Sequence, residues 1–227
     1  MNADAPLVSG RDLSRTYGHG PAAVVAVHGA NCNVFAGDQI ALTGPSGSGK
    51  STLLHLLAGL DAPTAGEVNW PALGGRPASQ PPGTVGLVFQ GPSLLPDLDV
   101  AENVALPLLL AGQSDAEAVG RALALLADLD IGDLATKLPE EISGGQAQRV
   151  AVARALIGEP RLILADEPTG QLDHTSAAAV IAMLIGRAER LGAALVVSTH
   201  DPLIADRFAT RWEMLDGRPL LPAGESC

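Results

Sequence analysis

The stretch that decides the fold is QIALTGPSGSGKS, residues Gln39–Ser51. It begins with a short apolar run, Gln39–Thr43, which predicts a buried strand, and it passes directly into a glycine-rich loop. The loop fits the pattern G-x-x-x-x-G-K-[ST] in full, and leucines at helical spacing follow it to about Leu60. Such a loop points backbone N–H groups at phosphate oxygens, and the helix N-terminus adds the positive end of its dipole. The stretch therefore predicts a phosphate-binding loop between a strand and a helix.

This loop carries the first set of candidate binding residues. Lys50 is expected to reach the β- and γ-phosphates of a nucleotide, and Ser51 is expected to offer its hydroxyl group to Mg²⁺. Kinases, GTPases and motor proteins share such a loop, so it does not by itself identify the class of nucleotide-binding protein. The residues expected to bind nucleotide here are Gly44, Pro45, Ser46, Gly47, Ser48, Gly49, Lys50, Ser51 and Thr52.

Strands alternate with helices on both sides of the loop. Strands are expected within Leu7–Tyr17 and at Ala22–Val27, Thr84–Phe89, Arg161–Ala165 and Ala194–Ser198, and helices are expected at 51–60, 114–129, 143–157 and 175–191. This alternation predicts an α/β fold with a mainly parallel core sheet. Residues 91–158 are more helical and predict a helical lobe within a single domain, 1–227. The segment Pro71–Gly83, rich in proline and glycine, is expected to be a loop.

Composition excludes several classes of protein. The 227 residues suit one domain, and 47 % apolar with only 3 % aromatic residues predicts a core of Leu, Val, Ile and Ala. The net charge of −11 disfavours nucleic-acid binding, because phosphate backbones repel an acidic chain. No run approaches the roughly 18 apolar residues needed to cross a bilayer. No secretion signal is expected at the N-terminus, and Cys32 and Cys227 lack a metal-ligand spacing, which favours a reducing cytoplasm.

A second motif ends the strand expected at Arg161–Ala165. Two carboxylates, Asp166 and Glu167, follow it directly. Asp166 at the strand end could hold Mg²⁺, and Glu167 would then be placed to polarise an attacking water. A strand followed by a solvated acidic turn would give the same pattern, so this motif alone leaves both interpretations open.

The sharper signal is Ile142–Gln146. Ser143 followed by two glycines and Gln146 would make a second anion site from a hydroxyl group, bare backbone and a helix N-terminus. An ordinary capped helix would have the same start. The segment nevertheless resembles the signature motif of ABC (ATP-binding cassette) ATPases, usually LSGGQ, with Ile142 where leucine is commonest. The resemblance implies that the residues Ser143, Gly144, Gly145 and Gln146 contact nucleotide.

The resemblance to ABC ATPases extends over essentially the whole chain. Gln90 matches the Q-loop glutamine, Gly170–Asp173 the D-loop, His200 the switch histidine, and Tyr17 the aromatic residue that stacks on adenine. The resemblance implies a P-loop NTPase of ABC type, with a mainly parallel core sheet, an antiparallel β part and a helical lobe that carries the signature.

The resemblance also implies a mechanism. In this family two subunits pair head to tail around two ATP molecules, so that Ser143 and Gly145 act on nucleotide held by the partner. Glu167 would be the general base, His200 would contact the γ-phosphate, and Gln90 would touch Mg²⁺ and relay to a membrane partner. The metal ligands implied are Ser51, Gln90 and Asp166, and Asp173 belongs to the binding set.

Finer features resemble one subgroup, the ATPases of lipoprotein-release, macrolide-export and FtsE-like systems. The runs Val88–Gln90, Leu94–Pro96, Glu102–Val104 and Ala165–Gly170 carry this likeness. It implies an ATPase that works at the inner face of the cell membrane with a separate FtsX- or MacB-type permease. The alternative is a soluble ABC ATPase that serves, for example, cofactor assembly. The segment Pro71–Gly83 is short compared with relatives that carry a basic helical segment there.

Overall fold

Two β-sheets form the framework of the computed structural model, which describes residues 5–220. The first is antiparallel, in the order β2-β1-β4. The second has the order β5-β6-β7-β3-β8-β9, and its pairings are parallel except for β8 with β9. The strands are β1 (Val8–Tyr17), β2 (Val24–Val34), β3 (Gln39–Thr43), β4 (Ala65–Asn69), β5 (Val85–Val88), β6 (Leu162–Asp166), β7 (Ala194–Thr199), β8 (Thr210–Leu215) and β9 (Arg218–Leu220).

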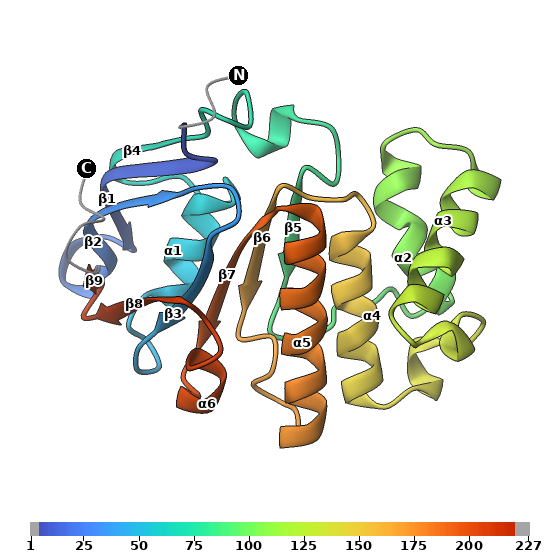
Figure 1. Ribbon diagram of the computed structural model, residues 1–227. Coiled ribbons are helices and arrows are strands. Elements are labelled where there is room, and N and C mark those ends of the chain that lie inside the picture. The colour runs from blue at the N-terminus through green and yellow to red at the C-terminus, as the bar shows by residue number, and fades with distance from the viewer. Residues whose placement is uncertain (1–4, 221–227) are drawn as a thin grey trace.

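Helices cover the six-stranded sheet on both faces (Figure 1). They are α1 (Lys50–Leu57), α2 (Val100–Leu110), α3 (Asp115–Asp128), α4 (Gly144–Leu156), α5 (His174–Leu191) and α6 (Pro202–Ala205), with short 3₁₀ turns at Gly20–Ala22, Pro77–Ser79, Gly132–Leu134 and Pro139–Glu141. No helix among residues 5–220 is both long enough and apolar enough to span a membrane.

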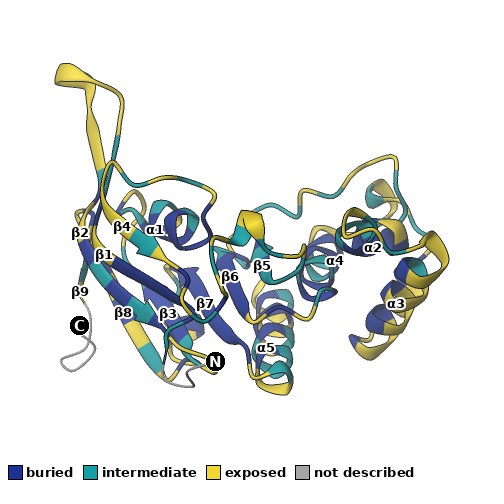
Figure 2. Cartoon of the chain, turned by 90° about the horizontal axis from the view of Figure 1, so that it is seen from above, coloured by how far each residue is buried: buried dark blue, intermediate teal, exposed yellow. Residues whose placement is uncertain are grey.

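The central strands are buried on both faces because neighbouring residues alternate between two cores. In β6, Leu162 and Leu164 join the core that includes α1 and the antiparallel sheet. Ile163 and Ala165 join the core that includes α2 to α5. A strand with two covered faces reads as a continuous apolar run, as β6 and β7 do. Figure 2 shows these strands dark blue, with the exposed tip joining β1 to β2 standing out from the body.

Most expected elements are present, with some differences. The strand expected at Ala22–Val27 is β2, which begins at Val24, after a 3₁₀ turn that contains Ala22, and runs on to Val34. The spacing of its buried residues is interrupted between Val27 and Ala30, where the pairing with β1 shifts register. Helix α2 lies in the region 91–158 that was expected to be helical, but no helix bounds were predicted there. The helix forms around Pro107 with a capping box in which Asp99 and Glu102 exchange hydrogen bonds.

Helices α2, α3 and α4 pack on one another at one end of the molecule (Figure 1). The loop Pro71–Gly83 is irregular, as expected, apart from the turn at Pro77–Ser79. Cys32 is buried, whereas Cys227 lies outside the described residues. The fold thus places the ends of β3, β6 and β7 side by side at one edge of the parallel sheet.

Candidate functional site

The phosphate loop connects the end of β3 to the start of α1. Gly49 stands at the N-cap of α1 with φ of 102°, and a Cβ atom there would collide with the carbonyl oxygen of Ala26. Only glycine tolerates both the backbone angle and the close approach. The hydroxyl oxygen of Ser48 is buried and has no hydrogen-bond partner within residues 5–220. A buried polar atom of this kind, in a tight loop at a helix N-terminus, fits a loop built to surround phosphate.

Lys50 is folded back into this loop. Its side chain is 5 % exposed, and its Nζ donates to the carbonyl oxygens of Gly44 at 2.9 Å and Pro45 at 3.0 Å. Nζ also lies 3.5 Å from Oε1 of Glu167. A buried ammonium needs such partners, because burial of an unpaired charge is costly. The lysine charge is therefore held between the loop and the carboxylate at the end of β6.

The ends of β6 and β7 are joined through Ser198. Asp166 lies directly opposite Ser198 in the parallel register. The Ser198 hydroxyl donates to Oδ1 of Asp166 at 2.6 Å and accepts the backbone N–H of Glu167 at 2.8 Å. Glu167 has a φ of 44°, which is uncommon for a residue with a side chain. Ser198 thus holds the chain where it turns from Asp166 to Glu167.

Glu167 and His200 form a direct side-chain pair at the site. Nδ1 of His200 lies 2.6 Å from Oε2 of Glu167. The glutamate side chain is 16 % exposed and the histidine 63 %. The pair lines a cavity of ≈ 450 Å³ together with phosphate-loop residues and Gln90. The lining residues are Ala26, Ser46, Gly47, Gly49, Lys50, Ser51, Thr52, Gln90, Glu167 and His200.

The signature residues do not line this cavity. They begin α4, where Ser143 and Gln146 form a reciprocal capping box at 2.9 Å and 3.2 Å. At Gly145 an added Cβ atom would lie 2.9 Å from the hydroxyl oxygen of Ser176, so this turn packs against the start of α5. Ser143 and Gly144 are exposed. The structure thus separates the signature motif from the phosphate loop of the same chain.

Asp173 and Tyr17 also lie outside the cavity. Asp173 caps α5, where its Oδ1 accepts from the backbone of Thr175 at 2.9 Å and of Ser176 at 3.0 Å. The Ser176 backbone and hydroxyl, followed by the Thr175 backbone, hold the pKa of Asp173 below its usual value. Tyr17 lies at the end of β1, where the residue is 40 % exposed and its hydroxyl donates to Asp61.

Sequence reasoning missed several positioning residues. Ser198 is one of these residues, and Gln148 and Arg154 of α4 are two more. Gln148 donates to the carbonyl oxygen of Phe89 at 3.1 Å. Arg154 donates to the carbonyl oxygens of Pro92 and Ser93. They hold the chain on either side of Gln90. Burial lowers the pKa of Arg154. Their spacing in α4 carries no signal of these contacts, which depend on where β5 ends.

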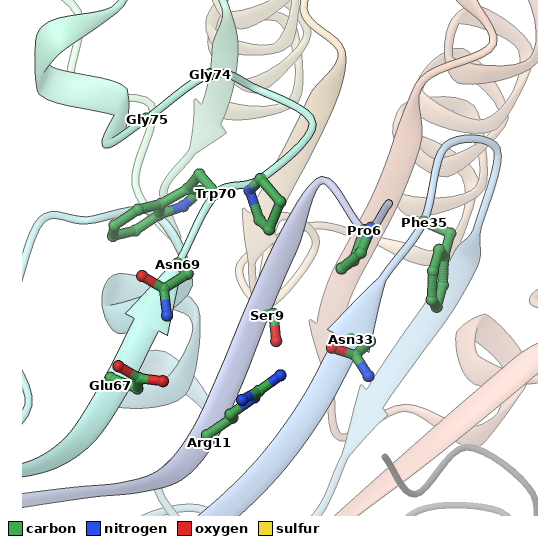
Figure 3. Close-up of a pocket in the computed structure, with 11 residues that line it drawn as sticks. Pro6, Ser9, Arg11, Asn33, Phe35, Glu67, Asn69, Trp70, Gly74 and Gly75 are labelled. Carbon is green, nitrogen blue, oxygen red and sulfur yellow. The ribbon is translucent and has the colours of Figure 1, made fainter. Parts of the chain in front are cut away.

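A larger cavity, ≈ 740 Å³, lies elsewhere and contains none of the motif residues. Figure 3 shows side chains of β1, β2 and β4 gathered along it, among them Ser9, Arg11 and Asn33, with Trp70 next to Asn69. Polar side chains on one face of an antiparallel sheet are the ordinary pattern of a solvated face. The chemistry of the motifs therefore belongs to the smaller cavity.

Comparisons with known proteins identify the family of this chain. Residues 27–170 match the family described as ABC transporter. The chain is 41 % identical over 221 residues to the lipoprotein-releasing system ATP-binding protein LolD of Shewanella denitrificans, covering 95 % of each chain. It is also 41 % identical over 208 residues to LolD of Legionella pneumophila, covering 89 % of this chain and 92 % of the relative.

Solved structures show the same fold. A dimeric ATP-binding cassette in a post-hydrolysis state, bound to ADP and Pi, superposes with a TM-score of 0.84 at 35 % identity, covering 93 % of this chain and 96 % of that one. A CbiO protein of Clostridium perfringens, part of the CbiONQ ABC transporter complex, gives 0.78 at 27 % identity, covering 96 % and 88 %. The chain belongs to the ABC transporter family and is one of its ATP-binding, ATP-hydrolysing subunits.

Proposed function

We propose that the cavity around Lys50, Glu167 and His200 is the hydrolytic site, with roles for its residues as follows. Lys50 and the backbone of the phosphate loop bind the β- and γ-phosphates of ATP. Glu167 accepts a proton from the water that attacks the γ-phosphorus, while ADP leaves. The single observation that carries this proposal is that lysine, carboxylate, histidine and Gln90 meet around one cavity although they are far apart in the sequence.

His200 and Ser198 prepare Glu167 for this step. The hydrogen-bond distance of 2.6 Å to His200 fixes one carboxylate oxygen. The hydrogen bond from the backbone N–H of Glu167 to the Ser198 hydroxyl fixes the backbone of Glu167. A general base must lie within hydrogen-bond reach of the water it activates, so a fixed carboxylate favours the reaction. The exposed position of His200 leaves its other ring nitrogen able to reach a γ-phosphate.

Mg²⁺ is the cofactor we propose for this site. Ser51, Gln90 and Asp166 would hold it through a hydroxyl group, an amide oxygen and a carboxylate, and such oxygen donors are the ligands that Mg²⁺ prefers. One oxygen of Asp166 is bound by Ser198, so the carboxylate is held in one orientation. Mg²⁺ would supply charge neutralisation between the β- and γ-phosphate oxygens.

We infer further that two copies of the chain complete each site. Ser143, Gly144, Gly145 and Gln146 lie outside the cavity of their own chain, and the exposed start of α4 is available to a second subunit. A related cassette is dimeric with ADP and Pi bound. Asp173 in the D-loop and Tyr17, which would stack on the adenine base, would complete the site.

The partner we propose is a FtsX- or MacB-type permease in the cell membrane, with this chain at its inner face. The 41 % identity to LolD proteins over nearly the whole chain supports this subgroup. Beside the Q-loop, Phe89, Leu106, Pro107 and Leu110 line an apolar hollow of ≈ 310 Å³, and Leu110 is 72 % exposed. We propose that the permease contacts this hollow, and that residues 91–158 act as the helical lobe which moves with it.

The catalytic roles are tested with Lys50→Ala and Glu167→Gln. Glu167→Gln should bind ATP with unchanged affinity and lose turnover by about 100-fold or more, since an amide cannot accept the proton. Lys50→Ala should lose ATP affinity, measured by calorimetry. Full turnover by Glu167→Gln would exclude Glu167 as the base. Unchanged affinity of Lys50→Ala would contradict the phosphate-binding role of the loop.

The partner is tested by capturing tagged Glu167→Gln from its native membranes with Mg-ATP in mild detergent. A membrane protein with few spans and a large external domain should co-purify, and Leu110→Asp should abolish its capture. Recovery of soluble partners alone would instead support the alternative of a cofactor-assembly ATPase.

A further inference from the structure

Tyr17 is held by two charged residues that no motif contains. Its hydroxyl group donates to Oδ2 of Asp61 at 2.8 Å. Arg15, two residues earlier on the same strand, places its guanidinium carbon 4.7 Å from the centre of the Tyr17 ring. The same guanidinium lies 2.8 Å from Oδ1 of Asp61. These three residues, Arg15, Tyr17 and Asp61, are called the tyrosine clamp below.

The clamp connects β1 with the turn that follows α1. The backbone N–H groups of Leu60 and Asp61 donate to the carbonyl oxygen of His55, in the last turn of α1. Thr64 donates through its backbone to Ser14 of β1 at 2.8 Å. Asp61 is thus fixed to the helix whose first residue is Lys50. The Tyr17 hydroxyl is therefore connected, through Asp61, to the end of α1 that lies opposite the phosphate loop.

The electrostatics of the clamp favour an ionised Asp61. Burial alone would raise the pKa of this carboxyl, but hydrogen bonds from Tyr17, the backbone of Ala62 and Arg15 together lower it. The side chains of Arg15 and Asp61 are only 25 % and 22 % exposed. A planar guanidinium lying on an aromatic ring is attracted to its π-electrons, and pairing it with a carboxylate fixes its orientation.

We propose that Asp61 and Arg15 are positioning residues for the base of ATP, which fix the plane of the Tyr17 ring at a set distance from the phosphate loop. The inference rests on the proposed role of Tyr17 as the platform for adenine. One face of the ring carries the guanidinium, and Tyr17 as a residue is 40 % exposed, which leaves surface for the base. A fixed ring gains affinity for the base because no side-chain freedom is lost on binding.

A purely structural staple between β1 and the α1 turn would show the same contacts, and the choice of ligand separates the two roles. ATP contains base and phosphates, whereas inorganic tripolyphosphate offers phosphates alone. A positioning role predicts that clamp variants weaken ATP binding and leave tripolyphosphate binding unchanged. A structural role predicts that both ligands lose affinity together, or that neither does.

The experiment measures the Kd of both ligands, with Mg²⁺, by calorimetry. Asp61→Ala and Arg15→Ala should each weaken ATP binding by about two- to ten-fold, the range expected for a misplaced aromatic stack. Asp61→Asn keeps an acceptor for the Tyr17 hydroxyl and should recover part of the loss. Tyr17→Phe removes only the hydroxyl group and keeps the aromatic ring, so it tests the hydrogen bond to Asp61 separately from the stacking surface. The matched control is Asp206→Ala, which removes a carboxylate from the exposed pair with Arg211.

Two results would overturn the proposal, and they differ in what else they overturn. If Tyr17→Ala leaves ATP affinity unchanged, both the platform and the clamp are wrong. If Tyr17→Ala weakens ATP binding but Asp61→Ala, Arg15→Ala and Tyr17→Phe do not, or if these variants weaken tripolyphosphate binding equally, the clamp is wrong and the platform stands. Tighter ATP binding by Arg15→Ala would show that the guanidinium competes with the base for the ring.

Discussion

At the scale of single residues, one hydroxyl group connects the two acidic residues at the end of β6. Ser198 is fully buried, and it bonds both to the Asp166 side chain and to the Glu167 backbone. Removing it would leave a carboxylate oxygen and an N–H group without their partner at the point where the chain adopts a positive φ. The position of the catalytic carboxylate therefore depends on a residue that does not touch the substrate.

Ser198→Ala tests this dependence. We expect a loss of about 1–3 kcal/mol in the free energy of unfolding, because buried polar groups lose a partner. We also expect kcat to fall by about ten- to a hundred-fold, since a small displacement of a catalytic group is costly. ATP affinity should change little. Ser79→Ala, which removes an exposed hydroxyl from the loop Pro71–Gly83, should change neither quantity. A wild-type kcat in Ser198→Ala would show that Glu167 is positioned by other contacts.

At the scale of elements, Asn103 organises the start of the helical region. It is fully buried in α2. Its Oδ1 accepts from the backbone of Leu95, and its Nδ2 donates to the carbonyls of Leu95, Leu98 and Asp99, at 2.8 to 3.0 Å. One amide thereby satisfies the irregular backbone between the Q-loop and α2. Without a buried polar side chain at this position, these backbone groups would lose their hydrogen-bond partner.

Asn103→Ala should therefore destabilise the protein by about 2–3 kcal/mol, because several buried backbone groups lose their partner. The measurement is the urea midpoint of unfolding at constant slope. Asn69→Ala, an exposed amide on β4, is the control and should stay within about 0.5 kcal/mol of the wild type. Equal midpoints for the two variants would mean that water replaces the Asn103 amide without cost.

The cap of α5 gives a pH-dependent prediction. The pKa of Asp173 is lower in the folded protein than its ordinary value of about 3.9. The ionised cap therefore contributes stability above that value, and the contribution is lost as the pH falls through the lower folded pKa. Asp173→Asn keeps a neutral capping oxygen that does not titrate. The difference in urea midpoint between wild type and Asp173→Asn should be constant from pH 7 to 5 and decrease below about pH 3.9. A difference that stays constant to pH 3 would contradict the lowered pKa.

The sequence predicts the strands and loops of the site better than their mutual contacts. The runs at β3, β6 and β7 are apolar because both faces are buried, so local pattern is enough to find them. Helix α2 lies in the region expected to be helical, but its bounds were not predicted, although the Asp99 and Glu102 capping pair was present. Ser198 could not be found, because its role follows from the parallel register that sets it opposite Asp166.

At the scale of the whole molecule, the two parts of the proposed site lie apart within one chain. The phosphate loop, Glu167 and His200 surround the cavity, whereas Ser143 and Gly144 are exposed at the start of α4 and do not line it. The role proposed for them is that of an anion site, made from a helix N-terminus with bare backbone. These residues lie away from the phosphate loop of their own chain. They could contact a γ-phosphate if a second copy of the chain brings its bound nucleotide to them.

The last prediction tests this pairing. Glu167→Gln with Mg-ATP should double in mass from 23.1 kDa in light scattering, because ATP is retained between two subunits. Adding Ser143→Arg should keep the protein monomeric while leaving its ATP affinity unchanged, since the larger side chain enters only the partner's site. Ser114→Arg in the same background is the matched control, because Ser114 is an exposed residue at the N-cap of α3. It should still form the dimer. If the Ser143→Arg protein also doubles in mass, or if it loses ATP affinity as a monomer, the signature acts within its own chain and the paired site is wrong.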